Sequence, residues 1–372
     1  MQSRSPSTNH PHPTSAEDIA LGHWIAVSAY ENLIRGIKST IPPSHHTPFT
    51  DSIAQFVTQL AHLNVGRQTR LPTGIRTTVD LGNISPGYVP CALFLEATLP
   101  LLLHCGTDSE LVVRGCTHPV SSRSVTYFAE VILPLVRRLG RRVDFFIHSF
   151  SFGDNPSGEV LLAVRKADSP IEPFFERERS PLVELKVLFG TNGFVPQVVD
   201  TAIHEVKNRL ESAGLFWPEI ETSLCHAQTH GGIVFAKAEY GNVAVGFERT
   251  VTNPDAFVEA AHQTANDLIL YDQGDGCVGP QLSPFLLSLA AVATLCEAAS
   301  GYSEKGHNTV PPRFRWTTAQ LDPSTIYLME QLTHLNNGVP IHIFGNVGTS
   351  ALIDVNPPET NHGVDDVKPS DV

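Results

Sequence analysis

The chain has 372 residues, 41% of them hydrophobic, which is enough for two domains of ordinary size with a sizeable core. Its formal net charge of -13 argues against a protein whose main role is to grip nucleic acid, although a local basic groove stays open. The six cysteines form no CxxC pair, so no structural zinc site is expected, and no segment has the apolar length of a membrane-spanning helix. The N-terminal residues lack the apolar core of a secretory signal, so we expect an intracellular, cytoplasmic protein with reduced thiols.

Both ends of the chain, residues 1–18 and 357–372, are polar and proline-bearing and are predicted to be disordered. Between them, helical and strand patterns alternate. In the first part we expect helices at 47–63, 89–105 and 124–140, and strands at 109–117, 142–152 and 158–166. Thr50 or Asp51 is the expected N-cap of the first of these helices.

The segment 181–272 is a separate block and is predicted to be a small inserted domain. Its expected elements are strands at 182–190, 219–225, 231–239 and 242–249, and helices at 195–214 and 255–271. The main domain would then comprise residues 19–180 and 273–356. Its last part is expected to hold an apolar helix within 277–294, a helix at 324–335 and strands at 340–345 and 350–355.

Three segments carry a family resemblance. SELVVRGCTHPVSSRSVTYFAEVILPLVRRLG is similar to L-x-G-G-T-(x)-A-P-x-x-D-Y-x-x-x-V-x-x-P, SFGDNPSGEVLL resembles R-G-Y-Y-P-x-G-G-G-E-V, and TPFTDSIAQF starts like T-P-G-L-R-P-Q-H-L. With the order of elements over 20–356, they resemble the RNA 3'-terminal phosphate cyclase family. The resemblance implies an α/β (α+β) fold of repeated βαβ-type sheet and helix units, the cyclase and EPSP-synthase-like fold, with a small inserted α/β domain. It also implies ATP-dependent adenylation of a histidine, followed by cyclisation of an RNA 3'-phosphate.

The positions that carry this chemistry in the family are replaced in this chain. Leu321 falls where the family has its histidine, and a slip of one residue brings Asp322. The family's Asp-Gln pair falls on Pro284 and Phe285, and the arginine of R-G-Y-Y-P falls on Phe150. Such a site would be apolar and short of positive charge. We therefore expect no self-adenylation, no cyclisation of RNA ends and no cofactor.

Three residues are candidate catalytic groups: Glu96, His118 and His148. Glu96 lies in the apolar stretch LFLEATLP, where a carboxyl with a raised pKa would suit a general acid, or would pair with an arginine such as Arg114. Each histidine is alternatively a hydrogen-bonded structural residue. The candidate substrate-binding residues are Phe150, Phe152, Gln281, Phe285, Leu321, Arg114, Arg123 and Tyr327. For the two arginines, a surface ion pair is the alternative.

No metal site is expected. The segment CHAQTHGG (225–232) places His226 and His230 on one side of an extended chain, but no carboxylate or third histidine is adjacent. The tail residues His10, His12 and His362 are interpreted as solvated rather than as a metal clamp.

The preferred hypothesis is a rewired enzyme that acts without a nucleotide on an apolar small molecule. Its reaction would be a cofactor-free cyclisation or isomerisation, including a pericyclic cycloaddition, in specialised metabolism. Nucleic acid is an unlikely partner on this view. One alternative is a non-catalytic cyclase-like scaffold in ribosome biogenesis, against which the net charge weighs. The other is an active RNA 3'-phosphate cyclase with a displaced histidine. A closed apolar cavity around Phe150, Phe285 and Leu321 would favour the first hypothesis, and an open basic groove would favour RNA.

Overall fold

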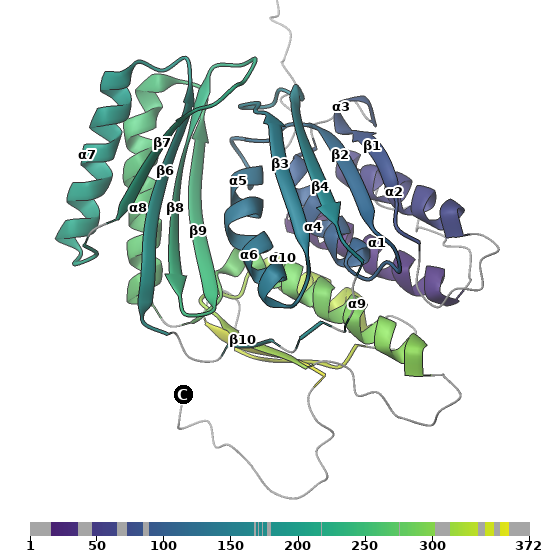
Figure 1. Cartoon of the computed structure of the whole chain (residues 1–372). Helices are drawn as coiled ribbons and strands as arrows, with labels where there is room; N and C mark the ends of the chain where they lie inside the picture. The colour runs from purple at the N-terminus through teal and green to yellow at the C-terminus, as the bar shows by residue number, and fades with distance from the viewer. Residues whose placement is uncertain are drawn as a thin grey trace, which may run out of the picture.

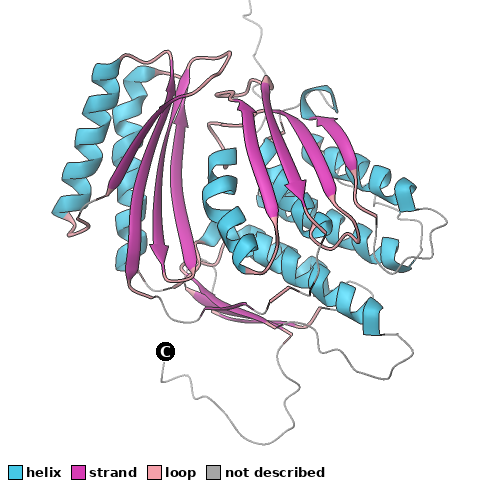
Figure 2. Ribbon diagram, in the orientation of Figure 1, coloured by secondary structure: helices cyan, strands magenta, loops and turns pink. Residues whose placement is uncertain are grey.

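The computed structural model describes residues 16–35, 47–64, 73–84, 89–166, 169, 171–172, 174–176, 180–216, 218–274, 276–301, 313–333, 339–345 and 350–356. Within these ranges lie three four-stranded sheets, with strand orders β1-β2-β4-β3, β11-β12-β10-β5 and β7-β6-β8-β9 (Figures 1 and 2). The mixed α/β class is as predicted. Helix α1 (Ala16–Arg35) begins inside the segment predicted to be disordered, and the three tail histidines lie outside the described residues.

The first sheet has one covered face and one open face. It consists of β1 (Arg76–Asp80), β2 (Ser109–Gly115), β3 (Val143–Ser149) and β4 (Gly158–Val164). Buried residues alternate with more exposed ones along β2 and β4, as expected for strands with one face on the core. Helices α1, α2 (Pro48–Asn64) and α4 (Cys91–Leu102) lie behind the sheet in Figure 1. A short helix, α3 (Leu81–Ile84), follows β1.

The helices behind the sheet form the centre of the core. All twelve residues of α4 are buried, because the helix packs on β2, α1, α2 and α9 (Ser283–Gly301). The apolar helix predicted within 277–294 therefore exists, but it begins only at Ser283, after a 3-10 turn η3 (Pro280–Leu282). It packs against α1, α4 and α10. Among the described residues, no helix has the length and apolarity to cross a membrane.

The N-cap predicted for α2 is wrong by one turn. The helix begins at Pro48, and the Thr50 amide donates to the Thr47 hydroxyl over 3.3 Å. Proline suits the first helical position because its missing N–H would have no helical acceptor there. Thr47, rather than Thr50 or Asp51, therefore caps this helix.

A continuous helix runs from Val125 to Arg138 and changes its hydrogen-bonding pattern on the way. It consists of α5 (Val125–Tyr127), a π-helical segment η1 (Phe128–Ile132) and α6 (Leu133–Arg138). Pro134 lies just after the π-helical segment and has no N–H to donate to the preceding turn. The wider π turn accommodates the proline without breaking the helix.

The inserted block forms its own sheet. Its strands are β6 (Leu182–Asn192), β7 (Glu219–Leu224), β8 (Gly231–Tyr240) and β9 (Val243–Val251). Helices α7 (Pro196–Ser212) and α8 (Phe257–Gln273) pack together, and α8 covers β8 and β9; a 3-10 turn η2 (Pro254–Ala256) precedes α8. On its other side, β9 contacts the helix 125–138. The predicted domain boundaries stay a prediction.

The third sheet contains the two closing strands and two strands that the sequence patterns did not indicate. It is formed by β5 (Phe174–Glu176), β10 (Phe314–Thr318), β11 (Ile341–Phe344) and β12 (Ala351–Val355). Helix α10 (Pro323–Thr333) follows β10. The three-residue strand β5 pairs in parallel with β10, far along the chain, so no local pattern announces it.

The segment 225–232 joins the inserted sheet to the first one. The Phe150 amide donates to the His226 carbonyl over 2.9 Å, and the Phe152 amide donates to the Thr229 hydroxyl over 2.9 Å. Gly231 closes this seam because a Cβ there would lie 2.3 Å from the Cβ of Phe152. The segment thus has a structural role that its histidine spacing did not indicate.

We predict that Gly231→Ala destabilises the protein by about 1–3 kcal/mol, because neither the backbone nor the Phe152 Cβ can move away cheaply. Thermal unfolding followed by circular dichroism would measure the loss. Gly279→Ala is the matched control, since its new Cβ would lie 3.7 Å from Val245, an ordinary contact. Equal melting temperatures for the two variants would contradict the prediction.

Candidate functional site

A polar cavity of about 380 Å³ lies where α1, α4, β9, η3 and the start of α10 meet the loop before the helix 125–138. The polar side chains that line it are Ser121, Ser122, Arg123, Glu248, Arg249, Gln281, Asp322 and Ser324. The apolar contributions come from Ile19, Leu93 and Val120. The lining is therefore suited to a polar ligand.

Arg123 forms the inner wall and is held from several sides. Its Nη2 lies 2.9 Å from the carboxylate of Glu96, and its Nη1 donates to the carbonyl oxygen of Gln281. The guanidinium carbon lies 5.7 Å from the ring centroid of Tyr127. Arg123 is 8% exposed, so its charge is largely committed to these internal contacts.

Glu96 is the candidate catalytic carboxylate, and it lies directly behind Arg123. Its side chain is fully buried, and neither of its oxygens accepts a well-directed hydrogen bond from the described residues. Burial raises the pKa of Glu96 to about 7, against the opposing effect of Arg123. Its partner is Arg123, whereas Arg114 pairs with Glu159 at the surface over 2.6 Å.

A second carboxylate, that of Glu248 on β9, occupies the N-terminus of the helix 125–138. It accepts hydrogen bonds from the Ser124 amide over 2.6 Å and from the Ser124 hydroxyl over 2.5 Å. That hydroxyl in turn accepts from the amides of Thr126 and Tyr127. Partial burial raises the pKa of Glu248, while the bonds from Ser124 oppose the rise. A helix N-terminus favours an anion, and here the protein supplies its own.

The outer wall of the cavity is also internally paired. Arg249 is 43% exposed and lies 2.7 Å from Asp267, while its Nη1 donates to the Glu248 carbonyl over 2.8 Å. Asp322 accepts from the Ser324 amide over 3.2 Å and from the Ser324 hydroxyl, which makes it the N-cap of α10. Asp322, one residue after the expected histidine position at Leu321, thus caps a helix.

The two candidate catalytic histidines do not line this cavity. His118 is fully buried, with Nδ1 3.0 Å from the Thr117 hydroxyl and Nε2 2.9 Å from the Thr126 hydroxyl. Burial lowers the pKa of His118 to about 3, so the ring is neutral at physiological pH. This geometry favours the structural alternative. His148 is exposed on β3, where the register shifts between Ile147 and Ser149.

Most side chains of the predicted apolar pocket are packed into the core. Phe152, Phe285 and Leu321 are at most 3% exposed and belong to the core. Phe150 stacks on His118 with ring centroids 5.0 Å apart, and Tyr327 is half-buried on α10. None of these five side chains lines the cavity; of the predicted binding residues, only Arg123 and Gln281 do.

Sequence reasoning missed several residues of the site. Glu248 and Arg249 interrupt the apolar run of β9, and two successive charges in such a strand are the signal that could have found them. His23, which does not line the cavity but is close enough to feel the charge of Arg123, was also missed. It is 1% exposed, and its Nδ1 lies 2.9 Å from the Ser288 hydroxyl. Burial, with the nearby charge of Arg123, lowers the pKa of His23 to about 3. No histidine among the described residues lines the cavity.

We predict that Glu96→Gln flattens the dependence of stability on pH. The folded chain releases the Glu96 proton near pH 7, whereas the unfolded chain releases it near its ordinary pKa of about 4.3. The folded state therefore binds more protons in between, and the free energy of unfolding falls as pH rises through this window.

The difference between pH 5 and pH 8 should shrink by on the order of 2 kcal/mol in the variant. Urea unfolding at both pH values would measure it, with Glu110→Gln, an exposed carboxylate on the first sheet, as the control. Parallel pH profiles for wild type and Glu96→Gln would argue against this role.

Comparison with known proteins places this geometry in a family. The model of the family described as RNA 3'-terminal phosphate cyclase matches residues 68–337. A protein of that name from Trichormus variabilis is 26% identical over 196 residues, which cover 53% of this chain and 56% of the relative. Relatives of the same name from Gloeothece citriformis and Methylococcus capsulatus are 23% and 24% identical, over 59% and 61% of this chain and 63% and 62% of their own lengths. In each case the match spans less than two thirds of the relative.

These findings correct the preferred functional hypothesis. The family model and the relatives bear the name of an RNA-modifying enzyme, so nucleotide-free chemistry on an apolar small molecule in specialised metabolism is wrong. The resemblance seen in the motifs is confirmed, since the family model spans well over half of the 372 residues. The chain belongs to the RNA 3'-terminal phosphate cyclase family.

Proposed function

We propose that this protein binds RNA 3' ends in the polar cavity and does so without forming a covalent nucleotide intermediate. Family membership and the name of the relatives, RNA 3'-terminal phosphate cyclase, support RNA as the ligand. One observation carries the proposal: two groups that could bind an anion are already occupied by carboxylates of the protein. Glu96 pairs with Arg123, and Glu248 accepts hydrogen bonds from Ser124 at the helix N-terminus; we call this arrangement the closed site.

The absence of self-adenylation is supported by the side chains at the cavity. A nucleophilic imidazole must reach the incoming phosphorus, and a nucleotide's phosphates need free cationic or amide donors. His23 and His118 are both buried and do not line the cavity. Leu321, at the expected position of the nucleophile, is buried in the core, and the next residue, Asp322, is engaged as a helix cap.

The chemistry of the lining favours a hydroxyl-bearing RNA end over a terminal phosphate. Carboxylate oxygens such as those of Glu248 accept hydrogen bonds from ribose hydroxyls, and Gln281 and the serines can donate or accept. Burial raises the pKa of Glu248 to about 7, so above that pH the carboxylates of Glu248 and Asp322 repel a phosphate, whose second ionisation is then well advanced. A terminal ribose with free 2'- and 3'-hydroxyls is therefore the end that we expect the cavity to prefer.

We predict that this protein forms no covalent adenylate. After incubation with α-labelled ATP and Mg²⁺ and then denaturation, the protein should retain no label. The Trichormus variabilis relative, treated in the same way, is the reference. The assay includes every histidine of the chain, among them His307 and His334, which lie outside the described residues. Stoichiometric labelling of the wild-type chain would overturn the proposal.

We predict that the polar cavity does not prefer a 3'-phosphate over a 3'-hydroxyl at the RNA end. Wild-type protein should bind an oligoribonucleotide with a 3'-hydroxyl at least as tightly as the same oligonucleotide with a 3'-phosphate. Glu248→Gln removes the competing charge at the helix N-terminus and should strengthen binding of the 3'-phosphate form about fivefold, or roughly 1 kcal/mol.

Fluorescence anisotropy with end-matched oligonucleotides would measure both effects. Glu211→Gln is the control, because it removes an exposed carboxylate from α7, away from the cavity. A wild-type preference of more than about tenfold for the 3'-phosphate would contradict the closed-site geometry.

A further inference from the structure

A second, larger cavity lies at the opposite end of the helix 125–138. Its volume is about 720 Å³, and it lies where that helix ends, beside the start of β3 and the end of β4. Five cationic side chains line it: Arg137, Arg141, Arg142, Arg165 and Lys166. We call this group the basic cavity. Because the 14-residue helix separates the two sites, they lie about 20 Å apart along it.

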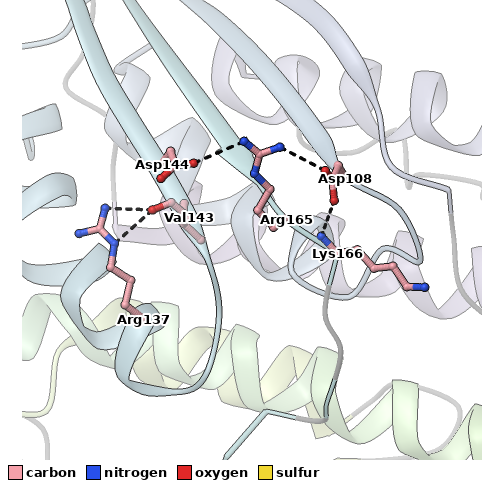
Figure 3. Close-up of polar contacts among 6 residues, drawn as sticks. All are labelled: Asp108, Arg137, Val143, Asp144, Arg165 and Lys166. Atoms are coloured by element: carbon pink, nitrogen blue, oxygen red, sulfur yellow. Dashed lines mark hydrogen bonds and ion pairs between the residues drawn. The ribbon is translucent and has the colours of Figure 1, made fainter.

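The carboxylates of the basic cavity do not balance its cations. Asp108 and Asp144 share a single arginine, with Arg165 Nη1 3.2 Å from Asp108 and Nη2 3.7 Å from Asp144 (Figure 3). The backbone amide of Lys166 also donates to Asp108 over 2.8 Å, which leaves the lysine ammonium outside this contact. With the buried Arg141 left aside, the four other cations of the lining face two carboxylates, an excess of two positive charges in a chain whose net charge is -13.

Arg137 is oriented by a backbone carbonyl rather than by a carboxylate of the cavity lining. It donates from Nε and Nη2 to the Val143 carbonyl over 3.1 and 2.9 Å (Figure 3). Arg141 is 4% exposed and donates from Nη1 to the Ser169 carbonyl over 2.5 Å. Carbonyl acceptors fix the direction of a guanidinium but leave its charge. The helix C-terminus accounts for a cation at Arg137. It does not account for Arg142, Arg165 or Lys166, which come from the strands or their ends.

An exposed aromatic side chain stands next to the basic cavity. Phe146 is 57% exposed and lies two residues after Asp144 on β3, so both project from the same, open face of the sheet. Its cross-strand neighbour Leu161 and the next one, Val112, are half-buried and extend the apolar strip across that face. The helices α1, α2 and α4 cover the other face (Figure 1).

We propose that the basic cavity binds the phosphate backbone of single-stranded RNA and that Phe146 stacks on one of its bases. A positively charged groove beside an exposed aromatic ring is the arrangement that binds unpaired nucleic acid. A duplex would offer phosphates but no free base face to Phe146. The inference rests on the proposed function for its ligand class, and it adds a contact site away from the polar cavity. The net charge of -13 is an average over the whole chain, and it does not exclude nucleic-acid binding at this cavity, because binding depends on the local charge.

The test uses a fluorescein-labelled single-stranded RNA of twelve nucleotides, prepared with a 3'-hydroxyl and with a 3'-phosphate. Arg142→Glu combined with Lys166→Glu should weaken binding of both forms about tenfold or more, because the basic cavity contacts the backbone and not the end. The slope of log K against log salt should fall by about 1.4, or about 0.7 for each lost phosphate contact. Lys207→Glu, at an exposed lysine of α7, is the matched charge reversal and should change neither quantity appreciably.

The aromatic contact is tested separately. Phe146→Ala should weaken single-strand binding about fivefold with an unchanged salt slope, whereas Phe344→Ala, at an exposed phenylalanine of β11, should not. Equal affinity for a duplex of the same sequence would overturn the stacking contact. Circular dichroism of each variant would verify that it is folded.

The two proposals fail in different ways. Undiminished RNA binding by the Arg142→Glu/Lys166→Glu variant overturns the basic cavity but leaves end binding in the polar cavity intact. Salt-dependent binding that this variant loses, with no response of end preference to Glu248→Gln, supports the basic cavity and overturns the closed-site proposal. A wild-type chain that binds neither RNA overturns both.

Discussion

The buried pair of Arg123 and Glu96 determines what the polar cavity can hold. A guanidinium that is 8% exposed needs a partner, and Glu96 supplies it from α4, a helix with no exposed residue. The pair therefore fixes the loop before the helix 125–138 against the core. On the proposed function, the same contact also engages a cation that a phosphate would otherwise meet. Glu248 similarly occupies the helix N-terminus at Ser124.

The main elements of the fold could be predicted from periodicity because most carry their own pattern. The helices 47–63 and 195–214 and the strands of the inserted block appear within a few residues of their expected bounds. Strands β1, β5 and β10 were not predicted, and each pairs with a strand that lies more than twenty residues away in the chain. The π-helical segment beside Pro134 could not be predicted from periodicity either, because its cause is the one amide hydrogen that the proline lacks.

The site was predictable only in part, for a different reason. Family motifs led to Arg123 and Gln281, and the apolar context of LFLEATLP led to Glu96. A replaced residue shows that a charge has gone, but not whether the new side chain faces the cavity or the core. Phe285 turns inward with the rest of α9, so the loss of a polar residue at this position placed an aromatic ring in the core and not in the lining of the polar cavity. Glu248 reaches Ser124 from 124 residues further along, a distance that no local pattern spans.

The walls of the polar cavity come from widely separated parts of the chain: Ile19 on α1, Arg123, Glu248 on β9 and Asp322 before α10. During synthesis from the N-terminus, the inserted sheet can pair its own neighbouring strands long before the last wall exists. The cavity is therefore among the last features to form. A truncated chain that ends before residue 322 would contain both Arg123 and Glu96 but would lack Asp322 and Ser324 of the cavity lining. During synthesis, the contact between Arg123 and Glu96 could therefore form before the cavity can bind a ligand.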